Sequence, residues 1–132
     1  WKMRTLTSIY NMLQDKHEPK KIIDYLKVDI EFSEWETLPQ IYASGILEKV
    51  KQISIDVHLH TLSSLSTFRK YYKMIKSLEN EHGFYRFASR PSVWAKEYFK
   101  AWDRLGNYAF EMAWYNSRYV NATFLKDPYT FW

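Results

Sequence analysis

The segment from Ile22 to Glu36 constrains most strongly what this chain can fold into. A run of mainly apolar and β-branched residues, from Ile22 to Ile30, ends among carboxylates and passes into a segment with a helical pattern. Both faces of the run carry apolar side chains, which indicates a central, parallel strand covered by helices on both sides. In open α/β sheets, ligands bind beyond the carboxyl ends of the strands, where Asp29 and Glu31 lie. These two acids are two residues apart and therefore point to the same face.

A second strand is predicted over residues 50–60, after a short helix. Ser33 can cap that helix, which continues to Tyr42, restarts at Pro39 and is closed by Gly45. Strand, helix and strand over about thirty residues form a βαβ unit, so the two strands should be parallel and adjacent, with a right-handed crossover. The second strand alternates, with Ile53, Ile55, Val57 and Leu59 facing one way and Ser54, Asp56, His58 and His60 the other.

Two further helices are expected on either side of this unit. The first begins at Thr5 or Thr7, follows helical spacing through residue 13 and ends at residues 17–19. The second covers residues 64–81 and ends at Gly83. Its apolar positions are Leu65, Phe68, Tyr72, Ile75 and Leu78, and its basic positions are Arg69, Lys70, Lys73 and Lys76.

The C-terminal part predicts two strands, residues 84–89 and 107–116, which can pair antiparallel. Between them, residues 91–106 show helical character, because Trp94, Tyr98 and Trp102 recur every four residues. We interpret this aromatic stripe as a helix that packs on the sheet. The alternative is a lid or an acceptor-binding wall.

The composition excludes several classes of protein. With 132 residues and 46% hydrophobic content, the chain is one globular domain or a piece of one. It has no cysteine, which excludes disulfides and thiolate chemistry, and no apolar run long enough for a membrane helix. The net charge of +4 comes from scattered lysines, so we expect a solvated basic helix face and no nucleic-acid partner. Residues 121–123 match a glycosylation acceptor pattern, which leaves the compartment unassigned.

The motif Lys27-x-Asp29-x-Glu31-x-x-Glu34-Trp35, followed by the strand at residues 52–58 and the final strand at residues 110–116, carries a family resemblance. The chain resembles the C-terminal half of an FkbM-related methyltransferase domain, of the methyltransferase-like protein twenty-four type. The resemblance spans roughly residues 1–120. It implies a class I S-adenosylmethionine-dependent, Rossmann-like α/β fold, with a seven-stranded sheet whose last strand is antiparallel. Residues 1–132 would then be a partial methyltransferase domain that supplies strands four to seven.

The resemblance also implies a cofactor and a reaction. The cofactor, S-adenosyl-L-methionine, would be held mainly by the N-terminal half, which is absent here, because Gly45, Gly83 and Gly106 form no glycine-rich loop. The reaction would be methyl transfer to an oxygen or nitrogen of an unknown acceptor, which can be a small molecule, a protein or a glycan. Asp29, Glu31 and His58 are the expected catalytic residues, and Asp29 and Trp35 the expected cofactor contacts.

Other interpretations of these residues stay open. Asp29 and Glu31 can be solvated acids at a strand end, and Glu34 and Glu36 ordinary acids of a first helical turn. Asp56, His58, His60 and Asp29 could form a carboxylate and imidazole metal site, but no tight ligand spacing supports one, so we predict no metal ligands. The family usually has glycine where this sequence has Phe32. That departure motivates an alternative function, a non-catalytic binding module on the same fold.

The strand at residues 22–30 has a further consequence for partners. If its neighbour belongs to the absent N-terminal half, this strand presents an unpaired edge. We therefore expect self-association through that edge.

Overall fold

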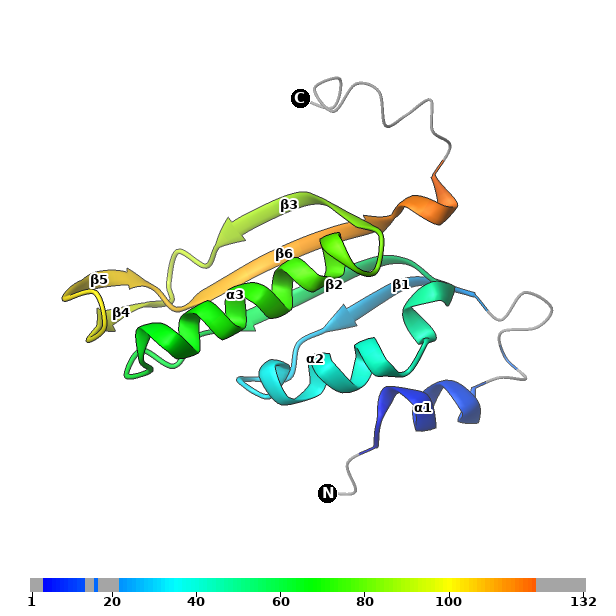
Figure 1. The fold of residues 1–132 in the computed structure, drawn as a ribbon, viewed down its shortest axis with the longest axis horizontal. Helices are drawn as coiled ribbons and strands as arrows, with labels where there is room; N and C mark the ends of the chain where they lie inside the picture. Colours follow the sequence, from blue (N-terminus) through cyan, green and yellow to red (C-terminus); the bar gives the residue numbers. More distant parts are fainter. Residues whose placement is uncertain (1–3, 14–15, 17–21, 121–132) are drawn as a thin grey trace.

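Figure 1 shows the computed structural model, which describes residues 4–13, 16 and 22–120. Within them, four strands form one mixed sheet in the order β1-β2-β6-β3. β1 and β2 pair in parallel, and β6 is antiparallel to both of its neighbours, β2 and β3. Only β6 is therefore reversed, as the sequence predicted for the last strand. The four strands are β1 (Ile23–Val28), β2 (Val50–His58), β3 (Phe84–Pro91) and β6 (Ala109–Asn116).

The helices begin where the sequence places capping residues. α1 (Leu6–Met12) begins after Thr5 and α3 (Leu65–Asn80) after Ser64, and each cap side chain accepts a backbone N–H bond from the first turn. α2 (Glu34–Ala43) follows Ser33, whose side chain makes no such bond, and Pro39 lies inside this helix without interrupting it. The predicted end of the first helix at residues 17–19 lies outside the described residues, and α1 itself ends at Met12.

The core lies between the helices and one face of the sheet. α2 and α3 cover that face, with α1 beside α2 (Figure 1). The predicted apolar side of β2 is buried, since Ile53 and Ile55 are fully inaccessible, as are Leu38 of α2, Leu78 of α3 and Trp114 of β6. Burial of this apolar area is the main source of stability for such a layer of helices on a sheet.

The prediction of a central first strand, covered on both sides, is wrong for the described residues. β1 is parallel to β2, as expected, but it lies at an edge of the sheet. On its outer face Tyr25 is 55% exposed, because the described helices pack on the other face. The sequence also placed Leu65 and Tyr72 on the apolar side of α3, and both are exposed. Among the described residues, no helix has both the length and the apolar character needed to cross a membrane.

The prediction of helical character over residues 91–106 is also wrong. This segment forms a separate two-stranded antiparallel sheet, β4 (Lys96–Phe99) and β5 (Arg104–Asn107). Trp94 is 92% exposed, so the aromatic stripe is not a buried helix face. Trp102 does pack on α3, where its ring stacks on Phe68 at 4.4 Å, but it does so from the β4–β5 turn.

Residues 91–106 form strands rather than a helix because of side-chain contacts that helical spacing does not reveal. Phe99 is buried, and its ring lies only 3.1 Å from the point where a β-carbon on Gly106 would stand. Glycine in β5 therefore permits close packing of the two strands.

The predicted glycosylation pattern at residues 121–123 lies outside the described residues.

Candidate functional site

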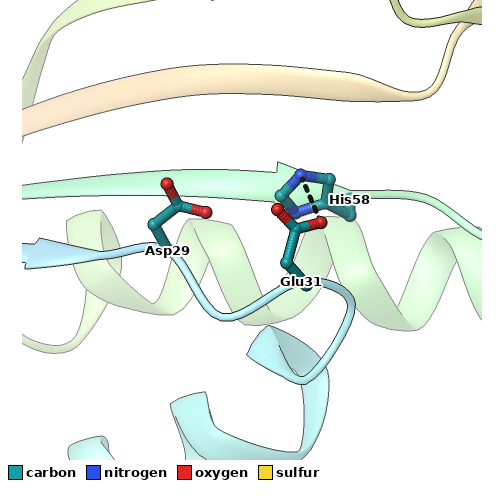
Figure 2. A group of neighbouring side chains, drawn as sticks. All are labelled: Asp29, Glu31 and His58. Atoms are coloured by element: carbon teal, nitrogen blue, oxygen red, sulfur yellow. Dashed lines mark ion pairs between the residues drawn. The ribbon is translucent and has the colours of Figure 1, made fainter.

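The ends of β1 and β2 bring three predicted site residues together. One donor atom each of Asp29, Glu31 and His58 lies within 4.8 Å of the other two (Figure 2). Glu31 Oε2 lies 3.7 Å from His58 Nε2. Asp29 and Glu31 are exposed, whereas the His58 side chain is 11% exposed. The cluster follows directly from the parallel pairing of β1 with β2, because parallel strands end at the same edge of a sheet.

The turn after β1 has an unusual backbone. Glu31 and Phe32 both adopt positive φ, 47° and 69°, in the left-handed region that glycine reaches at little cost. The turn is closed by a bond from the Ser33 N–H to the Ile30 oxygen at 3.2 Å. The family resemblance led us to expect glycine at position 32, and Phe32 occupies a backbone conformation that favours glycine.

The Phe32 side chain gives this conformation a compensating contact. Its ring stacks on His60 at 4.6 Å and on Tyr108 at 6.4 Å, and it lies tilted at 5.2 Å from the imidazole of His58. Aromatic contacts of this kind contribute roughly 0.5 to 1.5 kcal/mol beyond burial. The Phe32 side chain therefore lines the site, and its backbone forms part of the turn.

Glu34 is a site residue that sequence reasoning missed. It was expected to be an ordinary first-turn acid, but it is completely buried. Its Oε1 lies 3.2 Å from Nδ1 of His58 and accepts the Ile30 N–H at 3.3 Å, while its Oε2 has no hydrogen-bond partner. The signal was present in the sequence. Glu34 shares a face of α2 with Leu38 and Ile41, which lie four and seven residues later.

Trp35 forms a hydrogen bond with the main chain of His58. Its Nε1 donates to the His58 oxygen at 2.7 Å, and its ring stacks on Tyr71 at 3.8 Å. The residue is 8% exposed. The described contacts give Trp35 the role of positioning His58, and its contact with a cofactor stays a prediction.

Together these contacts fix the imidazole. In the neutral tautomer whose Nδ1 carries the hydrogen, Nδ1 donates to Glu34 Oε1 and the lone pair of Nε2 lies on the side of Glu31. An oriented imidazole beside two exposed carboxylates can accept a proton from a bound hydroxyl or amine, or it can ligate a cation.

A hollow with a volume of about 450 Å³ opens beside His58. It lies where β2 meets the ends of β3 and β6, and it is within the size range of small-ligand sites. Its wall includes Asp56, Arg90, Trp94 and Glu111. Two ion pairs border it, since Arg90 Nε donates to Glu111 at 2.7 Å and Lys27 donates to Asp56 at 2.5 Å.

Asp56 and His60, which the sequence placed on the same face as His58, do not join the cluster. Asp56 is paired with Lys27, and His60 is exposed and stacks on Phe32. Partial burial lowers the pKa of Lys27, but the hydrogen bond and charge of Asp56, with smaller effects of Asp29 and Glu111, outweigh it, so the pKa is raised. Lys27 therefore stays charged beside the hollow.

Comparison with known proteins gives a distant relationship. No protein-family model matches this chain, and no solved structure matches it significantly. Two curated proteins, both named probable methyltransferase-like protein 24, are similar. The protein from Rattus norvegicus is 29% identical over 108 residues and that from Homo sapiens 29% identical over 109 residues. Each match covers 74% of this chain and 28% of the relative, so the chain spans 28% of the length of the curated relatives that it matches.

Proposed function

We propose that this chain is the acceptor-side half of an S-adenosylmethionine-dependent methyltransferase domain of the class I, FkbM-related type. The observation that carries the proposal is the meeting of Asp29, Glu31 and His58 at the ends of two parallel strands. In open α/β sheets such strand ends are where ligands bind. The distant likeness to proteins named probable methyltransferase-like protein 24 supports the same reaction class.

The sheet topology also supports the proposal. The family resemblance predicts strands four to seven of a seven-stranded sheet, with the last one antiparallel. The described sheet has four strands, of which the last, β6, is the reversed one. The exposed edge at β1 is where the strands of the other half would continue this sheet.

In this reaction an acceptor oxygen or nitrogen attacks the methyl carbon of the sulfonium in line with the carbon–sulfur bond. The new bond forms as that bond breaks, sulfur takes its electron pair as S-adenosylhomocysteine leaves, and the acceptor loses one proton. His58, oriented by Glu34, is the proposed acceptor of that proton, and Asp29 and Glu31 hold the acceptor beside it. The hollow beside His58 has room for a small acceptor or for one residue of a protein or glycan.

S-Adenosylmethionine itself would be held mainly by the other half of the domain, with Asp29 and Trp35 at its border. The residues of this chain fit that division, because exposed carboxylates at a strand end can accept hydrogen bonds from a ligand. Trp35 contributes chiefly by fixing His58, since its indole is buried and bonded there.

The test uses the full-length protein with its upstream half. We expect saturable binding of S-adenosylmethionine by calorimetry and formation of S-adenosylhomocysteine with a suitable acceptor. His58→Gln should lower the rate of methyl transfer by about 100-fold or more, the usual contribution of general acid–base catalysis, while cofactor affinity changes little. Glu48→Gln, an exposed carboxylate on another part of the molecule, is the matched control. A protein that binds no S-adenosylmethionine would contradict the proposal.

One observation favours the second candidate, a non-catalytic binding module on the same fold. The Phe32 ring lies against His58, His60 and Tyr108, at the position where the family usually has glycine. It narrows access to the imidazole. Cofactor binding that is never followed by methyl transfer, together with activity gained on Phe32→Gly, would support this candidate over the first.

A further inference from the structure

Two carboxylates and one imidazole meet at the edge of the sheet, and these are donors that divalent metal ions use. Although the ligand spacing in the sequence predicted no metal ligands, we propose from the folded geometry that Asp29, Glu31 and His58 bind a divalent first-row transition cation such as Mn²⁺ or Zn²⁺. The proposal goes beyond methyl transfer and does not depend on it, because it rests on the geometry of this chain alone. Within the described part of the chain, these are the metal-ligating side chains that the fold gathers into a group of three.

The spacing of the donor atoms suits a cation once the two carboxylates rotate toward the imidazole. The three atoms lie within 4.8 Å of one another. A cation bonded tetrahedrally at about 2.1 Å to each donor holds any two of them about 3.4 Å apart. The most widely separated donors therefore need to approach by up to roughly 1.4 Å. Asp29 and Glu31 can do so by side-chain rotation, since both are exposed and Glu31 is 78% exposed at its side chain.

Glu34 supplies an independent observation that points to a metal ligand at His58. A histidine that ligates a metal usually donates its other ring N–H to a carboxylate, which fixes the ring and raises its basicity. Glu34 has this position, with Oε1 at 3.2 Å from Nδ1 of His58. The carboxylate is fully buried, and its Oε2 has no partner in the described structure. Burial of a carboxylate charge costs free energy unless an opposite charge lies nearby. A cation bound at Nε2 of His58 would supply that opposite charge for Glu34.

The electrostatics of the cluster favour the same conclusion. Two carboxylates that share a site repel each other, and a bound cation is the largest charge that can relieve this repulsion. Lys27 takes that role only in part, because its ammonium is paired with Asp56 at 2.5 Å and its charge acts less strongly on Asp29. A cation at the cluster would neutralise Asp29 and Glu31 and hold the turn after β1 in place.

The donor set also predicts which ions bind. Imidazole suits Zn²⁺, Fe²⁺ and related ions, whereas Ca²⁺ prefers six to eight oxygen donors. We expect Mn²⁺ and Zn²⁺ to compete for one site per chain and Ca²⁺ to compete poorly. The three protein ligands leave further coordination positions open, where water or an oxygen of another molecule can bind.

The first experiment uses the unmodified chain and Mn²⁺ as the probe. Paramagnetic Mn²⁺ broadens the NMR signals of nuclei close to it, so the imidazole signals of His58 should disappear at substoichiometric Mn²⁺. Those of His82, which lies against Tyr42 at the other end of α3, should persist. Recovery of the His58 signals on adding Zn²⁺ would support a shared site. Equal broadening of both histidines, or none at all, would overturn the proposal.

The second experiment measures Mn²⁺ affinity by titration of the free-ion EPR signal. Asp29→Asn, Glu31→Gln and His58→Gln should each remove most of the binding, and Glu34→Gln should weaken it about 10- to 100-fold, as loss of a metal ligand's orienting partner does. Glu36→Gln changes the net charge equally at an exposed position of the same helix, so its affinity should match that of the parent. If Glu36→Gln weakens binding as much as Glu31→Gln, only diffuse surface charge is involved and the proposal fails.

The outcome of the cation-binding experiments can be distinguished from the outcome of the methyl-transfer test. Cation binding is measured on this chain without S-adenosylmethionine, so its absence leaves the proposed methyltransferase function intact. Binding in a protein that transfers no methyl group would leave the cation site standing. If both hold, the cation would fix an acceptor oxygen, His58 would act as its ligand, and methyl transfer by the full-length protein would stop on chelation and resume with Mn²⁺.

Discussion

The indole Nε1 of Trp35 and the main-chain oxygen of His58 form a 2.7 Å hydrogen bond that joins the first turn of α2 to the end of β2. The preceding residue, Glu34, contacts the imidazole of the same histidine. One helical turn therefore fixes both the backbone and the ring of His58. This arrangement makes the first turn of α2 part of the site, although neither side chain is exposed.

Replacement of Trp35 by Phe tests that bond. The variant removes the N–H and leaves the buried His58 oxygen without its partner, so we expect the free energy of unfolding to fall by roughly 1 to 3 kcal/mol. Urea titration followed by far-UV circular dichroism gives the value. Trp94→Phe is the matched control, because Trp94 is 92% exposed and should change stability by less than about 0.5 kcal/mol. Equal losses in the two variants would contradict the role of the bond.

Substitution at position 32 should reverse the usual order of alanine and glycine. Phe32 has φ of 69°, where a residue with a β-carbon is disfavoured by about 1 kcal/mol or more relative to glycine. Phe32→Ala and Phe32→Gly both lose the ring contacts, but only the alanine variant keeps the backbone strain. We expect Phe32→Gly to be the more stable of the two by about 1 kcal/mol in chemical unfolding. A more stable alanine variant would show that the turn relaxes.

Glu79 should make stability fall in acid. Partial burial raises the pKa of Glu79, but hydrogen bonds from Lys76 and Trp114 and the charge of Arg86 outweigh it, so the pKa lies below its ordinary value of 4.5. A lowered folded-state pKa stabilises the protein above the unfolded-state value, and this stabilisation disappears as the pH falls through the folded-state pKa. Glu79→Gln should therefore be less stable at neutral pH by roughly 1 to 2 kcal/mol, with the difference shrinking in acid. Unfolding titrations over pH check this, and Glu36→Gln, with an exposed carboxyl, is the control.

Asn116 should tolerate neither loss of its amide nor replacement of the amide by a carboxylate. Its buried amide donates to the oxygens of Leu47 at 3.1 Å and Val50 at 3.0 Å, and its own oxygen accepts from the Arg118 N–H. Asn116→Ala should cost about 2 to 3 kcal/mol, because two carbonyls lose their donor. Asn116→Asp should cost more, since an acceptor would then face two acceptors. Thermal or urea unfolding gives the order, and an aspartate variant as stable as the parent would refute it.

The open edge at β1 should cause self-association. β1 has β2 on one side and no described strand on the other, and Tyr25 on its outer face is 55% exposed. The sedimentation coefficient of the chain should therefore rise with concentration. Tyr25→Lys adds a charge of the kind that protects natural edge strands and should reduce this dependence. A parent chain that stays monomeric at high concentration would contradict the expectation.

The sequence predicted the parts of the fold that depend on strong, long periodicity. The alternation of Ile53, Ile55 and Val57 correctly predicted a strand with one buried apolar face, and the βαβ spacing correctly predicted its parallel pairing with β1. It did not predict the β4–β5 sheet, whose strands have four residues each. Over so short a span, Trp94 and Trp102 mimic helical spacing by coincidence, and tertiary packing decides the structure.

The candidate site was likewise predicted only in part. Asp29 and Glu31 were predicted from their place at a strand end and His58 from the family resemblance, and the parallel register brings the three together. Glu34 was misjudged because acids are common in the first turn of a helix, where the dipole favours them. Its helical position relative to Leu38 was the better guide, since that face of α2 packs into the core. For Glu34, position in the amphipathic pattern of α2 predicted burial better than residue type did.

The place of β6 between β2 and β3 has a consequence for how the chain folds as it is made. β3 is synthesised before β6 but pairs with β6 in the described sheet, so it has no strand to bind until the ribosome has released residues 109–116. Folding should therefore wait for the C-terminal part rather than proceed strand by strand, since distant contacts form slowly. Nascent chains stalled before β6 should resist proteases poorly, and those stalled well after it should resist them.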